Sequence, residues 1–467
     1  MNKMLKLIRI CLLGAVLLQA ATSRAQPVTQ VAGGNLHTLF LKGDGSLWGM
    51  GYNADGELGT NGLITRPAKI VASNVVAVAA GTWHSLFLKS DGSLWAMGDN
   101  TYGELGDGTF RTYYPYAIYH PEQIVASNVT AIAAGTDFSL FLKSDGSLWG
   151  MGINNEGNLG YVNYSTNYSA NSVIVPEQIV DSGVTAIAAG QDFSLFIKND
   201  GSLWALGAHS LGQLGDGFLN PGTHLSAWWP EQIVSSGVTA VAAGWEHSLF
   251  LKSDGSAWGM GRDLYGQLGI VPGEYAPRPI QLLASNVTAI AAEQYSSLFL
   301  MRDGSLWGMG DNTTGPGQTS VIAGELGSYT VRYFHAPTKI ADGNITAISG
   351  GYSTTFFLKS DGSLWGLGDN QDYELGVGAG NAYAPEQIVA GPPGYNQITA
   401  RLISGGDVAL SFVGIVGASY ALERSSDLGS PNWVPQLTNS AGTDGALVFT
   451  STPDPTTNNF WRIRAVK

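Results

Sequence analysis

The sequence predicts an all-β protein: a seven-bladed β-propeller of four-stranded antiparallel blades, followed by a small C-terminal β-sandwich-like module. Three observations predict this fold. A hydrophobic run, an Asp-Gly turn and a Trp-containing run recur together seven times. Gly supplies 63 of 467 residues while only 13% of residues are charged, a balance typical of tight turns between paired strands. No apolar period of 3.6 residues persists over three turns, so almost no helix is expected.

Seven tryptophans mark the repeat, and they lie 47 to 58 residues apart. A period near fifty indicates a propeller or a related β repeat, because one such unit cannot bury its own apolar faces. We expect the tryptophans to be structural core that fills the space between blades. They are Trp48, Trp95, Trp149, Trp204, Trp258, Trp307 and Trp365.

The second repeat shows the strands of one blade in order. Small residues predict a first strand over 75–80, and a short hydrophobic run that ends in Lys predicts a second over 84–89. Asp91-Gly92 predicts the hairpin turn between the second and third strands, since Gly adopts the positive φ that such turns need. The third strand is expected at 94–97 and the fourth, after a long loop, at 123–125.

The ends of the chain predict further segments. Residues 1–25 combine basic residues, a short apolar run and small residues before Gln26, which indicates a secretory signal peptide. The propeller is expected over residues 28–390. Residues 391–404 are either a linker or a partial eighth repeat, and 399–412 could belong to the propeller or to the next unit. Residues 405–467 alternate apolar and polar positions, as a small C-terminal β domain does.

Charge and composition exclude several classes of function. The net charge is −13, and removal of residues 1–25 takes away four cations and no acid, so nucleic acid is not an expected partner. The one cysteine, Cys11, lies in the signal segment, and the mature chain is expected to be a secreted, periplasmic or cell-envelope protein without disulfides. The histidines are dispersed, so no metal site, no cofactor and no catalytic residues are expected. No transmembrane segment is expected, and the protein is expected to be a monomer.

The repeat resembles the regulator-of-chromosome-condensation (RCC1-like) repeat from about Val28 to Val389. The resemblance rests on Ala-Gly-x-x-His-Ser-Leu, then Asp-Gly, then a Leu-Trp run followed by Gly-x-Leu-Gly, as in Gly56-Glu57-Leu58-Gly59. The sixth repeat departs because its Gly-x-Leu-Gly arrives late, and in the seventh Tyr373 replaces the first Gly. The resemblance implies a secreted bacterial seven-bladed propeller. Sialidase-type propellers have a different spacing around Asp and Gly and are not favoured.

Antiparallel connectivity predicts that one face of the propeller varies between repeats. The loop after the first strand and the long loop after the third should emerge together, opposite the repetitive Asp-Gly turns. Aromatic and acidic residues on such loops are typical of recognition surfaces. The residues expected to bind a partner are Trp83, Trp245, Tyr295, Tyr352, Asp137, Asp192 and Glu246. His37, His84, Phe138, Phe193 and His247 end the short loops and are expected to pack inward.

The sequence therefore predicts an exported, non-enzymatic binding scaffold that recognises a protein or glycan through one face. Two alternatives come from the resemblance. Secreted propellers of this type include β-lactamase inhibitors, which implies an inhibitor of an enzyme. The family also includes an exchange factor for a small GTPase, which implies guanine-nucleotide exchange. A third relative, a plant ultraviolet photoreceptor, has Arg where this chain has Glu246, so its cation–π pairing is missing here.

Overall fold

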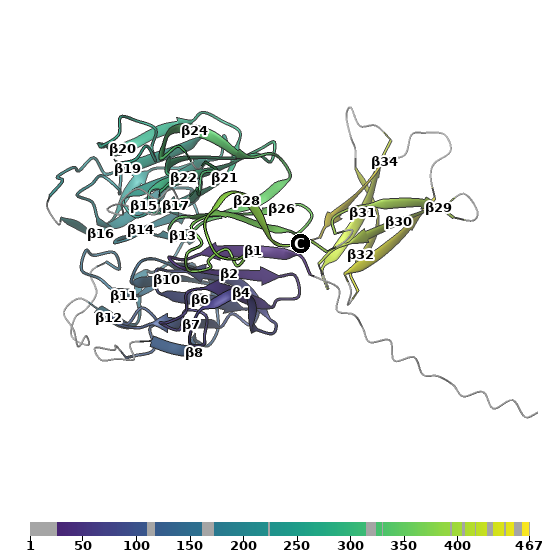
Figure 1. Cartoon of the computed structure of the whole chain (residues 1–467), viewed down its shortest axis with the longest axis horizontal. Helices are drawn as coiled ribbons and strands as arrows, with labels where there is room; N and C mark the ends of the chain where they lie inside the picture. The colour runs from purple at the N-terminus through teal and green to yellow at the C-terminus, as the bar shows by residue number, and fades with distance from the viewer. Residues whose placement is uncertain are drawn as a thin grey trace, which may run out of the picture.

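The computed structural model describes residues 26–109, 117–160, 172–222, 225–313, 324–328, 330–392, 395–403, 407–415, 417–426, 433–442, 445–452 and 460–466. The expected signal peptide, residues 1–25, lies outside them. Within these ranges every regular element is a β-strand (Figure 1). Seven four-stranded antiparallel sheets follow one another along the chain, which confirms the expected all-β fold of sequential four-stranded blades.

Each sheet, called a blade below, is ordered from its first to its fourth strand as in the sequence. The first strands are β1 (Val28–Gly33), β5 (Val75–Ala80), β9 (Val129–Ala134), β13 (Val184–Ala189), β17 (Val238–Ala243), β21 (Val287–Ala292) and β25 (Ile345–Gly350). The second strands are β2 (His37–Lys42), β6 (His84–Lys89), β10 (Phe138–Lys143), β14 (Phe193–Lys198), β18 (His247–Lys252), β22 (Ser296–Met301) and β26 (Thr354–Lys359).

The third strands carry the repeat tryptophans, and the fourth strands lie at the outer edge. The third strands are β3 (Leu47–Gly51), β7 (Leu94–Asp99), β11 (Leu148–Ile153), β15 (Leu203–Ala208), β19 (Ala257–Asp263), β23 (Leu306–Asp311) and β27 (Leu364–Gly368). The fourth strands are β4 (Ile64–Val71), β8 (Ala117–Val125), β12 (Ser172–Val180), β16 (Ser226–Val234), β20 (Glu274–Leu283), β24 (Tyr333–Ala341) and β28 (Ala382–Val389).

The fourth strand is longer than the sequence predicts. In the second blade it begins at Ala117 rather than at residue 123, and Pro121 lies inside it. The pairing of β7 with β8 shifts between Ala96, opposite Glu122, and Gly98, opposite Ile118. Pro121 falls in this bulge, where its missing N–H costs no ladder bond. The same shift brackets a proline in each of the other six blades, so the proline that suggested a loop marks a bulge.

The hydrophobic core lies between neighbouring blades. One cluster, for example, combines Leu39 and Leu58 of the first blade with Val78, Phe87 and Met97 of the second. A further cluster contains residues of the sixth, seventh and first blades. Backbone hydrogen bonds also join the two ends of the repeat array, from Val28 N to Gly362 O (2.9 Å) and from Tyr352 N to Gly34 O (3.0 Å). The first blade therefore packs against the last.

The seven tryptophans are half-buried, and each packs against a hydrophobic cluster that neighbouring blades share. Each ring also has a lysine over it. In the second blade the Trp95 ring stacks on Phe87, with 6.0 Å between centroids, and the Lys89 Nζ lies 3.7 Å from the ring centroid. The fully buried aromatic residue of the blade is Phe87.

A hydrogen-bond chain connects each Asp-Gly turn to its tryptophan. Asp91 Oδ1 accepts bonds from the backbone N and the hydroxyl of Ser93, at 2.9 and 2.6 Å. Ser93 Oγ in turn accepts the Trp95 indole N–H at 2.9 Å. Gly92 has a φ of 80°, as the expected turn requires. The same chain occurs in all seven blades, so this face is built for structure.

The C-terminal residues form two three-stranded sheets. One contains β29 (Thr399–Leu402), β30 (Val408–Val413) and β33 (Ala446–Ser451), and the other contains β31 (Ser419–Ser425), β32 (Val434–Ser440) and β34 (Phe460–Ala465). Phe412 and Phe449 from the first sheet and Tyr420 and Leu422 from the second share one buried cluster. Because β30 pairs with β33, the segment whose assignment the sequence left open pairs within this C-terminal unit.

Candidate functional site

The short loop after each first strand lies beside the long loop after the third. In the second blade the backbone N of Asp99, where the long loop starts, donates to Trp83 O in the short loop at 2.9 Å. The equivalent bond occurs in every blade. The Asp-Gly turns instead bond to the connection between blades, as in Val75 N to Gly45 O (3.0 Å). The two kinds of variable loop therefore share one face, called the loop face below.

Each short loop has two variable positions with different surroundings. The residue that follows the loop glycine is called the inner position, and the next residue is called the outer position. The inner residues are Asn35, Thr82, Thr136, Gln191, Trp245, Gln294 and Tyr352, and six of them line a central cavity of about 480 Å³. The outer residues are Leu36, Trp83, Asp137, Asp192, Glu246, Tyr295 and Ser353. The sequence-predicted site thus divides into two rows.

A row of glycines brings the short loops together around this cavity. A Cβ at Gly81 would lie 2.8 Å from the carbonyl oxygen of Gly135, and a Cβ at Gly135 would lie 2.8 Å from that of Gly190. The same Cβ atoms would lie 2.4 and 2.3 Å from the rings of His84 and Phe138. Glycine is required here for space, since the loop of one blade lies directly against the loop of the next.

The residues that end the short loops pack inward, as expected. His37, His84, Phe138, Phe193 and His247 are each at most 1% exposed. His84 Nε2 lies 2.9 Å from Ser139 Oγ of the following blade, and His37 Nε2 lies 3.0 Å from Ser85 Oγ. Burial lowers the pKa of His84 to about 4 and that of His37 to about 3. These histidines are neutral structural groups and do not belong to the loop-face surface.

In the sixth blade, other residues replace both the loop glycine and the ring that ends the short loop. Glu293 stands where the other blades have the loop glycine, and Ser296 stands where five of them have a ring. The Glu293 carboxylate accepts hydrogen bonds from Ser296 and, at 2.6 Å, from Thr355 of the next blade. Burial raises its pKa to about 8. The carboxyl group therefore takes both the space and the inter-blade bond that a histidine supplies elsewhere, and Gly350 leaves room for its stem.

Aromatic residues of the fifth, sixth and seventh blades form one connected group, called the aromatic arc below. Trp245 makes edge contacts with Tyr295 (5.8 Å between centroids) and Tyr352 (5.1 Å). Tyr295 contacts Tyr265 at 5.1 Å, which stacks on Tyr333 at 5.2 Å. Tyr333 is 38% exposed whereas Tyr295 is only 7% exposed. The structure thus brings three predicted residues together and adds Tyr265 and Tyr333.

Trp83 lies apart from the aromatic arc. Its ring makes an edge contact with Tyr52 in the long loop of the first blade, with 5.9 Å between centroids. Trp83 and Trp245 occupy different loop positions, because Trp83 is an outer residue and Trp245 an inner one. The sequence grouped them by residue type, whereas alignment of the loops from their glycines would have separated them.

Acidic residues occupy the other side of the loop face. Asp137 and Asp192 lie at outer positions of the third and fourth blades. Burial, and then the charges of Asp99 and Asp192, raises the pKa of Asp137 to about 6. Burial also raises the pKa of Asp99, with a smaller contribution from Asp55. Asp99, Asp137 and Asp192 are called the acidic arc below. Their like charges repel one another.

Glu246 has a cationic partner in the same blade. Arg262 Nη1 donates to Glu246 Oε2 at 2.9 Å. Arg262 comes from β19 of the same blade, and sequence reasoning did not identify it. Glu246 is therefore neutralised locally, and it does not add an unpaired charge to the loop face.

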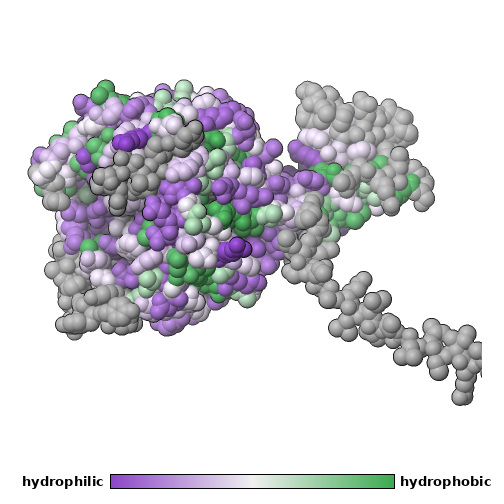
Figure 2. Space-filling model, viewed as in Figure 1, coloured by the Kyte–Doolittle hydropathy of each residue, from purple (hydrophilic) through white to green (hydrophobic). Residues whose placement is uncertain are grey.

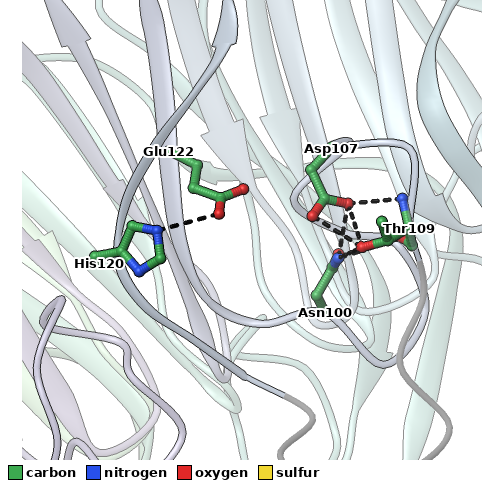
Figure 3. A network of polar contacts seen from close by, with 5 residues as sticks. All are labelled: Asn100, Asp107, Thr109, His120 and Glu122. Atoms are coloured by element: carbon green, nitrogen blue, oxygen red, sulfur yellow. Dashed lines mark hydrogen bonds and ion pairs between the residues drawn. The ribbon is translucent and has the colours of Figure 1, made fainter.

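Buried polar side chains hold the long loops in place. Asn100 Oδ1 accepts Leu105 N at 3.2 Å, and Asn100 Nδ2 donates to Asp107 Oδ1 at 3.0 Å (Figure 3). Asp107 Oδ1 also accepts the backbone N of Thr109 at 2.8 Å (Figure 3). Deeper in the same loop, burial raises the pKa of Glu104 well above its usual value. These groups are satisfied within the loop, so they position it and leave recognition to the residues around the cavity.

Hydrophilic residues cover most of the propeller surface in the view of Figure 2, and hydrophobic residues form scattered patches. Within the described ranges, no three His, Cys, Asp or Glu side chains come together as metal ligands. The described part of the chain also contains no helix that is long and apolar enough to cross a membrane.

Comparison with known proteins gives a family match. The family described as "RCC1-like domain" matches residues 13–320. The ultraviolet-B receptor UVR8 of Arabidopsis thaliana is 30% identical over 145 residues, which cover 30% of this chain and 31% of that protein. The X-linked retinitis pigmentosa GTPase regulator homolog of Caenorhabditis elegans is 28% identical over 316 residues, covering 58% of this chain and 22% of that protein. The matched region thus spans less than a third of each relative.

Two solved structures share the fold. Human WBSCR16 has a TM-score of 0.61 and 23% identity, covering 72% of this chain and 87% of that chain. Yeast RCC1 (Prp20), in a complex with Kap60, has a TM-score of 0.62 and 22% identity. The match covers 78% of this chain and 84% of that chain. At these identities the likeness concerns the fold, and it agrees with the sequential four-stranded blades.

Proposed function

The chain belongs to the RCC1-like domain family, and on that premise we propose that it is a non-enzymatic scaffold that binds a protein through its loop face. The observation that carries this proposal is that the loop face carries both the aromatic arc, of which Trp245 and Tyr352 line the cavity, and the acidic arc. Rigid aromatic side chains next to polar groups are the typical anchors of protein interfaces. A glycan, the other ligand class expected from the sequence, would use the same rings for stacking.

Support for a protein ligand also comes from the family. The solved structure of yeast RCC1 shows that relative bound to another protein, Kap60. Fold likeness does not transfer a particular partner, because function depends on the residues displayed. Inhibition of a partner enzyme remains a candidate, since the aromatic arc could anchor on an enzyme surface. Guanine-nucleotide exchange is a candidate from family likeness alone.

We further propose a monomeric, seven-bladed ring that is exported by a bacterium. Ring closure is supported by the cluster shared by the sixth, seventh and first blades and by the Tyr352–Gly34 hydrogen bond. Export is supported by the basic and apolar character of residues 1–25. N-terminal sequencing of envelope material should begin near Gln26, and recovery of the full-length chain from the cytoplasm would contradict export.

The binding surface can be tested with two pairs of substitutions. A partner is first captured from the exported fraction. Its affinity is then measured for the double variant that carries both Trp245→Ala and Tyr352→Ala. We expect this pair to weaken binding about thirtyfold, since truncation of a true anchor costs about 2 kcal/mol or more. The control pair, Ser90→Ala with Ser253→Ala, changes exposed residues on the opposite face and should bind as the parent does.

Salt provides a second measurement on the same complex. Because the acidic arc gathers like charges, association with a basic partner should slow as ionic strength rises. Equal affinity of the two substitution pairs, with both shown to be folded, would contradict the proposed loop-face site.

A further inference from the structure

The central cavity has an asymmetric wall. Asn35, Thr82 and Thr136 line one side with small polar groups, and Trp245 and Tyr352 line the other side with rings. The cavity is within the usual range of ligand sites, about 300 to 1,000 Å³. Its inner wall consists of the first strands, where small residues predominate, and the aromatic side chains of the lining lie in the short loops.

The cavity favours a cation. Its lining residues among the described part of the chain include no Lys, Arg or His, and Glu293 is mostly protonated at neutral pH because burial raises its pKa to about 8. Outside the mouth, the charges of Asp99 and Asp192 both raise the pKa of Asp137, so the potential there is negative. Arg262 on this face is already bonded to Glu246. A positive group entering the cavity would reduce the repulsion within the acidic arc.

Trp245 and Tyr352 can hold such a cation. The two rings meet edge to face at 5.1 Å, with an interplanar angle of 79°, so they form a corner. Tryptophan and tyrosine faces attract cations within about 6 Å, and a planar guanidinium stacks on them better than an ammonium does. Both rings lie at inner positions, whereas the equivalent residues of the first three blades are Asn and Thr. The corner is thus a feature of this side of the cavity.

Gln294 supplies a second, independent indication of a ligand. It is the inner residue between Trp245 and Tyr352 and is only 3% exposed. Its side chain reaches toward the Tyr352 phenol, but the amide nitrogen makes no hydrogen bond of normal geometry with the described residues. The buried amide has two N–H donors, and the Tyr352 phenol can accept only one of them, so a main-chain carbonyl of a bound peptide would satisfy the other.

We propose that the central cavity is an arginine-binding subsite: the guanidinium of a partner's arginine lies in the Trp245–Tyr352 corner, and Gln294 donates to the carbonyl of the same segment. This inference rests on the proposed protein-binding function and names the side chain that enters the site. Lysine would bind more weakly, because its compact ammonium cannot stack as a plane.

The test uses Nα-acetyl-L-arginine N-methylamide as the probe, with isothermal titration calorimetry at low ionic strength. A probe of this size is expected to bind in about the millimolar range. Its neutral isostere, Nα-acetyl-L-citrulline N-methylamide, should bind at least about tenfold more weakly if charge and cation–π contact dominate. Trp245→Ala should abolish saturable binding, and Trp245→Phe should restore part of it. Thr136→Arg, which places a guanidinium at the mouth, should also abolish it.

Ser253→Ala is the matched control, because it changes an exposed residue of the same blade on the opposite face. The proposal is overturned if the arginine probe shows no saturable binding, if citrulline binds equally, or if Trp245→Ala leaves binding unchanged. The two proposals can fail separately. A captured partner that depends on Trp245 and Tyr352, but that the arginine probe does not displace, would leave the scaffold function standing and remove the arginine subsite.

Discussion

Single hydroxyl groups connect the turns of this protein to its aromatic residues. Ser93 is fully buried, and it donates to Asp91 while it accepts the Trp95 indole N–H. The bond from Ser93 lowers the pKa of Asp91, although the carboxylate itself is exposed. The serine is therefore the residue that couples turn and strand, and the recurrence of Ser after Asp-Gly follows from this role.

We expect Ser93→Ala to destabilise the protein by about 1–3 kcal/mol, because the buried indole N–H loses its acceptor. The free energy of unfolding would be measured by urea denaturation. Ser90→Ala changes an exposed serine in the same turn and should leave the midpoint unchanged. Equal effects of the two substitutions would show that the hydrogen-bond chain contributes nothing.

Residue burial also predicts which of two aromatic residues contributes more to the stability of the protein. Phe196 is 1% exposed, whereas Trp204, which stacks on it at 6.3 Å, is partly exposed. Phe196→Ala should cost about 3–5 kcal/mol, the usual range for a buried aromatic residue. Trp204→Ala should cost less, since its ring loses fewer contacts. Thermal unfolding of both variants checks the order, and a larger loss for Trp204→Ala would contradict it.

The strands and loops show a regularity that depends on neighbouring blades. Six of the seven short loops have a glycine because the next loop lies against it, and each fourth strand places a proline at its bulge. Gly135 does not have a positive φ, so glycine is required there because there is no space for a Cβ atom. The residue type in a loop of one blade is thus restricted by contacts with the next blade, about fifty residues further along the sequence.

Gly135→Ala tests this crowding. The new Cβ would lie 2.3 Å from the Phe138 ring and 2.8 Å from Gly190 O, so we expect a loss of about 1–3 kcal/mol from overpacking. Gly343→Ala is the matched control, because its Cβ would lie 3.4 Å from the nearest neighbouring atom, Asp303 O, and its φ is ordinary. Chemical denaturation should show the control at or slightly above parent stability. A tolerated Gly135→Ala would mean that the loops are not in contact.

Across the whole molecule, buried ionisable groups predict how stability depends on pH. Burial raises the pKa of Glu57, Glu293 and Glu374 to about 8 each. The folded state therefore holds more protons than the unfolded state between about pH 4.5 and 8, and the free energy of unfolding falls as pH rises through that range. The buried histidines, with pKa values lowered to about 3 or 4, act in the opposite direction below about pH 6.5.

Stability should consequently be greatest at mildly acidic pH. Calorimetric melting temperatures should be lower at pH 8 than at pH 6. Glu57→Gln and Glu374→Gln should reduce this difference, because glutamine does not titrate and Gln213 and Gln267 already occupy the equivalent loop position. An unchanged difference in the double variant would contradict the assignment of the pH dependence to these carboxyl groups.

The sequence by itself determined the repeat, its strands and its turns. The strands of the second blade at 75–80 and 84–89 lie where the sequence predicts them, because local alternation and Asp-Gly turns specify them without distant contacts. The family follows from the same local patterns, and so does the assignment of the variable loops to one face.

Only the tertiary structure decided which loop residues act together. Trp245 and Tyr352 meet across the intervening blade, whereas Trp83 pairs with Tyr52 and Glu246 is neutralised by Arg262. The half-buried state of the tryptophans also depends on packing between blades. So does the replacement of the loop glycine by Glu293 in the sixth blade, where Glu293 lines the central cavity. Local sequence specifies the fold of each blade, but the surface that the blades share arises from contacts between loops that local patterns do not pair, such as those of Trp245 and Tyr352.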